Sequence, residues 1–276
     1  MPAQSRYTAI ALSAAAFLAA CDQSPSVDHY VLALSWQPAF CEFRQDRPEC
    51  RALDSRDFAA RHLALHGLWP NSGPNEGPTY CGVDSSVEAL DRPQSWCELP
   101  EIDVGAETRA ALAPAMPGTR SCLDRHEWIK HGTCAGIDVE TYFAGMLDLA
   151  AAVHGTELGR LIAANIGREL PRQQLIDAFE AAFGRGAGQA LTLICARGGD
   201  GTYLSEIRIA LKPTALDGEL DAEDLYLSGP QPAGFCPGIV RIDRVRQQRR
   251  PILRKPAASA RNRLSLATIV EFAHAQ

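Results

Sequence analysis

Two short segments gather most of the side chains in this sequence that could perform acid–base chemistry. The first is His66-Gly67-Leu68-Trp69-Pro70. The second is His126-Glu127-Trp128-Ile129-Lys130-His131-Gly132-Thr133-Cys134. Residues four positions apart lie on one face of a helix, so one turn of the second segment would present imidazole, carboxylate and ammonium groups together.

A zinc site is one alternative for the second segment. His126-Glu127 resembles the start of a zinc-binding helix, but the second ligand would then stand at position 130, which is Lys130. His131 comes one residue later, about 100° further round the helix. Structural histidines held by hydrogen bonds are the other alternative, and they explain a lone histidine better than four ionisable residues within six positions. We therefore expect no metal and no cofactor.

Two histidines with a carboxylate and a lysine suit phosphodiester cleavage in which the substrate supplies its own nucleophile. The 2′-hydroxyl of RNA can attack the adjacent phosphorus while a base removes its proton and an acid protonates the leaving 5′-oxygen. Histidine suits both tasks because its pKa lies near 6.5. Lys130 could stabilise the negative charge of the phosphorane. Glu127 could orient an imidazole or hydrogen-bond the phosphorane.

Both segments, in this order, resemble the active-site segments of the ribonuclease T2 family. Leu32–Cys41 (LALSWQPAFC) is similar to the first strand of that family, and Cys195 and Cys236 resemble its C-terminal cystine. The resemblance covers about Tyr30 to Arg241. It implies an endoribonuclease that cleaves single-stranded RNA with low base specificity and without metal, through a 2′,3′-cyclic phosphate to 3′-phosphate ends.

The resemblance also implies a role for each residue of the two segments. Those roles are His131 as general base, His66 as general acid, Glu127 and Lys130 as phosphorane stabilisers, and His126 as a phosphate binder. Trp69, Asn71 and Tyr80 are implied to bind the substrate's bases, with core packing as the alternative for Trp69. The base preference stays open, because Asn71 stands where some members place an acidic residue.

Two other functions compete with this interpretation. One is a metal-dependent hydrolase, which EDTA would inactivate. The other is a non-catalytic envelope lipoprotein that binds RNA. The presence of every implied catalytic residue weighs against the second. RNA is thus the expected partner, and we expect a monomer.

Periodicity predicts the elements that must position these residues. Alternating apolar residues predict strands at His29–Trp36, Leu63–Leu68, Ala190–Ala196 and Tyr203–Leu211, with glycines at 198, 199 and 201 marking a hairpin between the last two. Helical patterns followed by glycine predict helices at Leu123–His131, Asp138–His154, Thr156–Ile166 and Arg172–Phe183. Interspersed strands and helices with a hairpin favour a single α+β domain, a central antiparallel sheet flanked by helices and stapled by disulfides.

Nine cysteines point to an oxidising compartment. Setting one aside leaves eight, enough for four disulfides. The family resemblance implies Cys81–Cys134 and Cys195–Cys236. By elimination, Cys41 pairs with Cys50 and Cys97 with Cys122.

The N-terminus is typical of a bacterial secretory signal. Arg6 precedes an apolar run from Tyr7 to Ala20, and Leu18-Ala19-Ala20-Cys21 resembles a lipobox that would make Cys21 a lipidated first residue. Ordinary signal cleavage nearby is the alternative. We expect a signal peptide at 1–20, a tether at 21–28 and a catalytic domain at 29–243. The enzyme would lie in the periplasm or cell envelope, held to membrane lipid through Cys21 or else secreted in soluble form.

Composition and charge restrict the remaining possibilities. The 276 residues are 46% apolar and 22% charged, which excludes a disordered, collagen-like or coiled-coil chain. The net charge of −6 divides into +7 for Arg241–Gln276 and −13 for the rest. The main domain is therefore no general nucleic-acid adhesive. Residues 244–276 are expected to be a basic, partly disordered tail, with a basic arm for lipid or RNA as the alternative.

Overall fold

A six-stranded sheet forms the centre of the protein in the computed structural model, which describes residues 27–73, 77–199, 201–227 and 236–245. Cys21, the expected signal, most of the tether and nearly all of the basic tail lie outside those residues. The strands follow the order β2-β1-β5-β6-β3, and β4 pairs with β5. Their bounds are β1 His29–Ser35, β2 Ala64–Asn71, β3 Glu169–Pro171, β4 Leu191–Gly198, β5 Gly201–Leu211 and β6 Ile239–Arg241.

The strands pair antiparallel apart from β5 and β6, which run parallel where Tyr203 faces Arg241. The predicted α+β fold is therefore confirmed, with one parallel contact added. β3 and β6 were not predicted from the sequence. Each has only three residues, too few to carry an alternating pattern.

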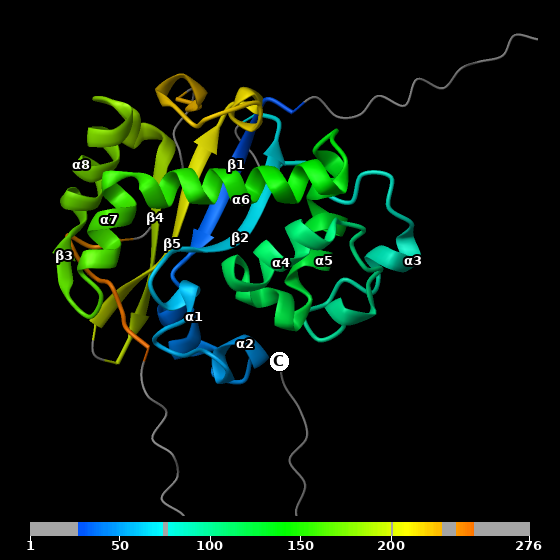
Figure 1. Cartoon of the computed structure of the whole chain (residues 1–276), viewed down its shortest axis with the longest axis horizontal. Helices are drawn as coiled ribbons and strands as arrows, with labels where there is room; N and C mark the ends of the chain where they lie inside the picture. Colours follow the sequence, from blue (N-terminus) through cyan, green and yellow to red (C-terminus); the bar gives the residue numbers. More distant parts are fainter. Residues whose placement is uncertain (1–26, 74–76, 200, 228–235, 246–276) are drawn as a thin grey trace, which may run out of the picture. The chain divides into compact units, whose positions relative to one another are not determined.

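Helices cover the sheet, and Figure 1 shows α6 lying across one of its faces. Asp138 caps α6 by accepting a hydrogen bond from the backbone N–H of Thr141, and Thr156 caps α7. None of the described helices has the length and apolar character needed to cross a bilayer. The helix bounds are α1 Gln37–Phe43, α2 Pro48–Arg51, α3 Ser85–Glu88, α4 Ala106–Ala115, α5 Leu123–Lys130, α6 Val139–Gly155, α7 Glu157–Ala164 and α8 Arg172–Phe183.

Alternation along β1 and β5 divides the sheet into two chemically different faces. Leu32 and Leu34 of β1 stand opposite Ile209 and Ile207 of β5, and all four are fully buried in the core. The side chains between them point to the other face. That second face carries polar side chains such as Ser35 and Glu206. The apolar side chains of each strand hold it in the core, and this positions the polar side chains on the opposite face.

Four disulfides join the pairs expected from the sequence: Cys41–Cys50, Cys81–Cys134, Cys97–Cys122 and Cys195–Cys236. Two of them fasten the segment after β2 to both ends of α5. Cys122 directly precedes that helix and Cys134 lies just beyond it. Each bridge is expected to stabilise the fold by roughly 2–4 kcal/mol, and these two also hold residues 81–97 against α5.

Candidate active site

A β-bulge in β2 aims His66 at the polar face of the sheet. Ala33 pairs with Gly67 while Leu34 pairs with Leu65, so His66 is the extra residue between them. Bulges redirect side chains and occur often beside active sites. The His66 side chain is 33% exposed, enough to meet a substrate.

α5 brings the second segment to the same face. Its last residues present His126, Glu127 and Lys130, and His131 follows directly as the C-cap. Gly132 follows the C-cap, and no larger residue fits there because a Cβ would lie 2.3 Å from the Trp128 ring. The helix thus ends at Lys130, one residue before the predicted end at His131.

Glu127 lies at the centre of the cluster and is 1% exposed. Its Oε1 lies 3.7 Å from Nε2 of His66 and 3.8 Å from Nε2 of His126. Its Oε2 accepts a 2.9 Å hydrogen bond from the indole N–H of Trp69. Burial raises the pKa of Glu127, although the charges of His66 and His126 oppose that shift. One buried carboxyl group therefore connects both segments.

Glu206 of β5 is a second carboxylate in the cluster that the sequence analysis missed. Its Oε2 lies 2.7 Å from Nδ1 of His66. Burial alone lowers the pKa of His66, but the hydrogen bond with Glu206 and the charges of Glu127 and Glu206 outweigh it, so the pKa is raised. His66 is therefore the imidazole that stays protonated to higher pH.

The environment of His131 shifts its pKa in the direction opposite to that of His66. Its ring lies 5.6 Å from that of Trp69 and 6.1 Å from that of His126, measured between centroids. Burial, followed by the neighbouring charge of Lys130, lowers the pKa of His131 to about 3. One histidine of the cluster thus favours the cation and another the neutral base, the combination that acid–base catalysis requires.

His126 is held by a network that the sequence did not reveal. Asp91 lies 2.7 Å from its Nδ1 and also accepts a 2.8 Å hydrogen bond from the hydroxyl of Tyr80. Trp96 stacks on the His126 ring at 4.5 Å, and Arg47 lies over the indole of Trp96. The imidazole is thereby fixed, with Nε2 directed towards Glu127.

The three expected base-binding residues lie in different settings. Trp69 packs within the cluster, with the guanidinium carbon of Arg208 4.7 Å from its ring centroid. Tyr80 adopts a left-handed backbone conformation, with φ of 56°, and its hydroxyl is engaged by Asp91. Asn71 ends β2, and its Oδ1 is buried without a hydrogen-bond partner. Base binding by these residues stays a prediction.

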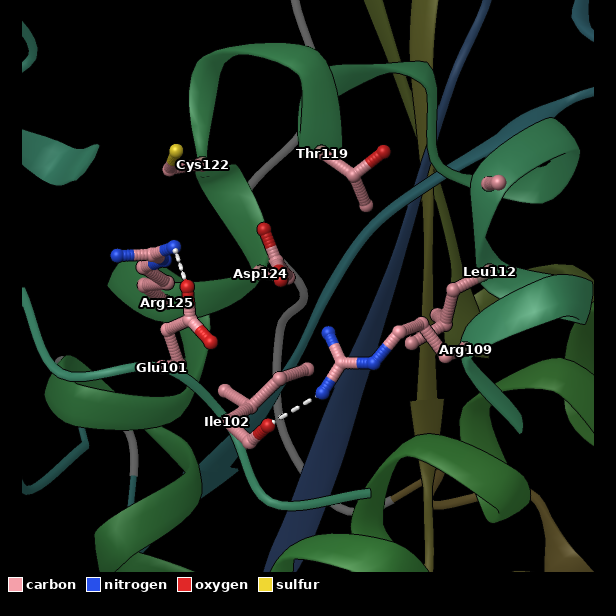
Figure 2. Close-up of a pocket in the computed structure, with 9 residues that line it drawn as sticks. Glu101, Ile102, Arg109, Leu112, Thr119, Cys122, Asp124 and Arg125 are labelled. Carbon is pink, nitrogen blue, oxygen red and sulfur yellow. Dashed lines mark hydrogen bonds and ion pairs between the residues drawn. The ribbon is translucent and has the colours of Figure 1, made fainter. Parts of the chain in front are cut away.

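One pocket among the described residues lies apart from this cluster. A pocket between α4 and the start of α5 has its arginines already engaged: Arg125 pairs with Glu101, and Arg109 donates to the carbonyl of Ile102 (Figure 2). Within the described part of the chain, no three His, Cys, Asp or Glu side chains are arranged to hold a metal ion.

Comparison with known proteins gives the same family as the sequence motifs. The model of the ribonuclease T2 family matches residues 27–221. Ribonuclease I of Escherichia coli K12 is 35% identical over 237 residues, covering 79% of this chain and 86% of that protein. The intracellular ribonuclease LX of Solanum lycopersicum is 28% identical over 132 residues, covering 48% of this chain and 51% of its own length.

Solved structures share the fold. A point mutant of RNase MC1 in complex with 5′-UMP superposes with a TM-score of 0.53 at 18% identity, covering 79% of this chain and 99% of that one. RNase NT in complex with 5′-AMP gives 0.51 at 18% identity, covering 80% and 100% of the two chains.

Proposed function

This chain belongs to the ribonuclease T2 family and is an endoribonuclease, and we propose that it cuts single-stranded RNA, with low base specificity, by two-histidine acid–base catalysis. His131 removes the proton of the 2′-hydroxyl, and the oxygen attacks phosphorus. His66 gives its proton to the 5′-oxygen as the P–O5′ bond breaks. The products are a 2′,3′-cyclic phosphate and a free 5′-hydroxyl.

The second step reverses the roles. His66, now neutral, removes a proton from water, which attacks the cyclic phosphate. His131, now protonated, donates to the departing 2′-oxygen, and a 3′-phosphate remains. Both histidines end in the state in which they began, as a catalytic cycle requires.

One observation carries this assignment: the two imidazoles have opposite electrostatic partners. His66 lies between the carboxyl groups of Glu127 and Glu206, whereas His131 follows Lys130. A proton donor needs the first setting and a neutral base the second. Lys130 and Glu127 would stabilise the phosphorane, and His126 would bind the phosphate.

The test is digestion of RNA with and without EDTA, followed by analysis of the product ends. We expect cyclic phosphate ends in both cases and no cleavage where a 2′-deoxy nucleotide replaces the ribose. His66→Ala and His131→Ala should each lower the rate by at least about 10²- to 10⁴-fold, whereas His62→Ala, an imidazole outside the cluster, should not. Loss of activity in EDTA, or cleavage at the deoxy position, would contradict the mechanism.

The compartment follows from the cysteines. Four disulfides are typical of an extracellular or periplasmic enzyme. The finer proposal is a bacterial envelope lipoprotein with a signal at 1–20, Cys21 lipidated, a tether to residue 28, a catalytic domain at 29–243 and a basic tail. The lipobox-like run and the odd cysteine support it. We further propose that the enzyme acts as a monomer.

A further inference from the structure

Glu206 is nearly buried in the sheet, yet it contacts His66 of the cluster. It stands on the second strand from β2, since β1 pairs with both β2 and β5. Its side chain is 10% exposed. The Nδ1 atom that it binds is the ring nitrogen of His66 away from Glu127, because Nε2 is the atom nearest that carboxylate.

We propose that Glu206 is the positioning residue of the general acid: its carboxylate holds Nδ1–H of His66 and leaves the proton on Nε2 facing the reaction site. This inference rests on the proposed role of His66 as the acid. Without a partner on Nδ1, the exposed edge of the imidazole could turn away from the leaving 5′-oxygen. With a hydrogen-bond acceptor at Nδ1, both the orientation and the tautomer of the His66 ring are set.

The Glu206 carboxylate is itself fixed on both oxygens. Oε1 accepts a 2.6 Å hydrogen bond from Nε of Arg208, and Oε2 accepts one of 3.3 Å from the hydroxyl of Ser35 in addition to its contact with His66. Ser35 is the β1 residue paired with Glu206, so the sheet register delivers this contact. The carboxylate cannot rotate without losing these bonds together, which makes it a rigid acceptor.

Among the described residues, the charged and titratable groups that act on His66 come from β5 and from the α5 segment. β5 contributes Glu206 and Arg208, while α5 contributes Glu127 and, beyond its end, His131. Burial and the charge of Arg208 lower the pKa of His66, and only the two glutamates raise it. Oε1 of Glu127 lies 3.7 Å from Nε2 of His66, and Oε2 of Glu206 lies 2.7 Å from Nδ1 of His66. Glu206 is therefore the closer of the two groups that keep the acid protonated.

The test begins with a measurement that needs no substrate. The pKa of His66 is read by NMR titration of its ring proton, assigned with His66→Ala, in the wild type and in Glu206→Gln. Removing the charge should lower that pKa by about one to three units, and Glu206→Ala, which also lacks the acceptor, should lower it at least as far. Arg208→Gln should raise it. Glu169→Gln, which breaks the distant ion pair with Arg241, should leave it unchanged.

The second measurement is kcat/KM against pH on RNA and on a nucleoside 3′-(4-nitrophenyl phosphate), whose leaving group needs no proton. Glu206→Gln should move the alkaline limb on RNA down by the shift seen in the titration. It should leave cleavage of the activated ester within about threefold of wild type, which also shows that the variant is folded.

Results that contradict the role of Glu206 can be distinguished from results that contradict the role of His66. A wild-type pKa of His66 in Glu206→Gln, or an unmoved alkaline limb, would overturn the role of Glu206. A His66→Ala enzyme that loses as much activity on the activated ester as on RNA would instead overturn His66 as the acid.

Discussion

Glu127 and Gly67 approach so closely that no side chain fits between them. A Cβ on Gly67 would lie 2.0 Å from Oε2 of Glu127 and 2.5 Å from Nε1 of Trp69. The Glu127 carboxylate therefore occupies the space that a side chain at position 67 would fill. Neither segment can form the cluster without the other.

Gly67→Ala should accordingly inactivate the enzyme by displacing Glu127 and breaking its bond with Trp69. Overpacking of this kind typically costs about 1–3 kcal/mol in stability, so the fold should survive while kcat/KM on RNA falls by at least about 10². Gly155→Ala is the matched control, because a Cβ there meets nothing within 4 Å. Wild-type activity in Gly67→Ala would show that the carboxylate need not lie where it does.

Glu127→Gln should keep the shape of the cluster and lose its charge. We expect kcat/KM on RNA to fall by about 10²- to 10³-fold, the range for removing one group that stabilises a transition state. Glu101→Gln changes a glutamate that is 77% exposed and should have no effect. If the two variants have equal activity, Glu127 has no part in the reaction.

The pH dependence follows from the two opposite shifts. A folded pKa of His66 above its ordinary 6.5 means that the acid is present below that raised value and is lost as the pH rises through it. A pKa of about 3 for His131 means that the base is already neutral at pH 5. A profile of kcat/KM on RNA should therefore stay high from about pH 5 past 6.5 and then decline. An alkaline limb below 6.5 would contradict this arrangement.

Asp91→Asn should weaken the hold on His126 without removing the imidazole. Because His126 is proposed to bind phosphate, the effect should appear mainly as a rise in KM, about tenfold, which corresponds to roughly 1.4 kcal/mol. Asp148→Asn, on an exposed position of α6, is the control. A fall in kcat with an unchanged KM would place His126 in the chemical step instead.

The sequence predicts the parts of this protein that depend on local patterns. Alternation reveals the long strands, and Asp138 and Gly132 mark where helices begin and end. His66 lies in the first segment, and Glu127 and His131 lie in the second. Each segment can be recognised from the sequence because its residues are consecutive in the chain. The resemblance to a known family supplies their roles.

Contacts between distant segments are what the sequence does not reveal. Glu206 reaches His66 across 140 residues through the register of three strands and a bulge. Asp91 reaches His126 because two disulfides hold its segment against α5. One signal was present: Glu206 and Arg208 alternate with the buried residues Ile207 and Ile209, and a charged residue in such a strand needs a partner.

Cys21 lies outside the described residues, and its expected lipidation determines where the native protein is found. If it is the lipidated first residue, the native protein should partition with membranes, because a diacylglyceryl group supplies the two chains that stable anchoring needs. Activity should not depend on the anchor, since His66, Glu127, His131 and Glu206 all lie far beyond position 21 in the chain. Cys21→Ser should therefore abolish lipidation, while the catalytic domain made without its signal cuts RNA at the wild-type rate. Mass spectrometry of the native N-terminus decides the matter: an unmodified Cys21, or a mature chain that begins after it, would mean a soluble enzyme.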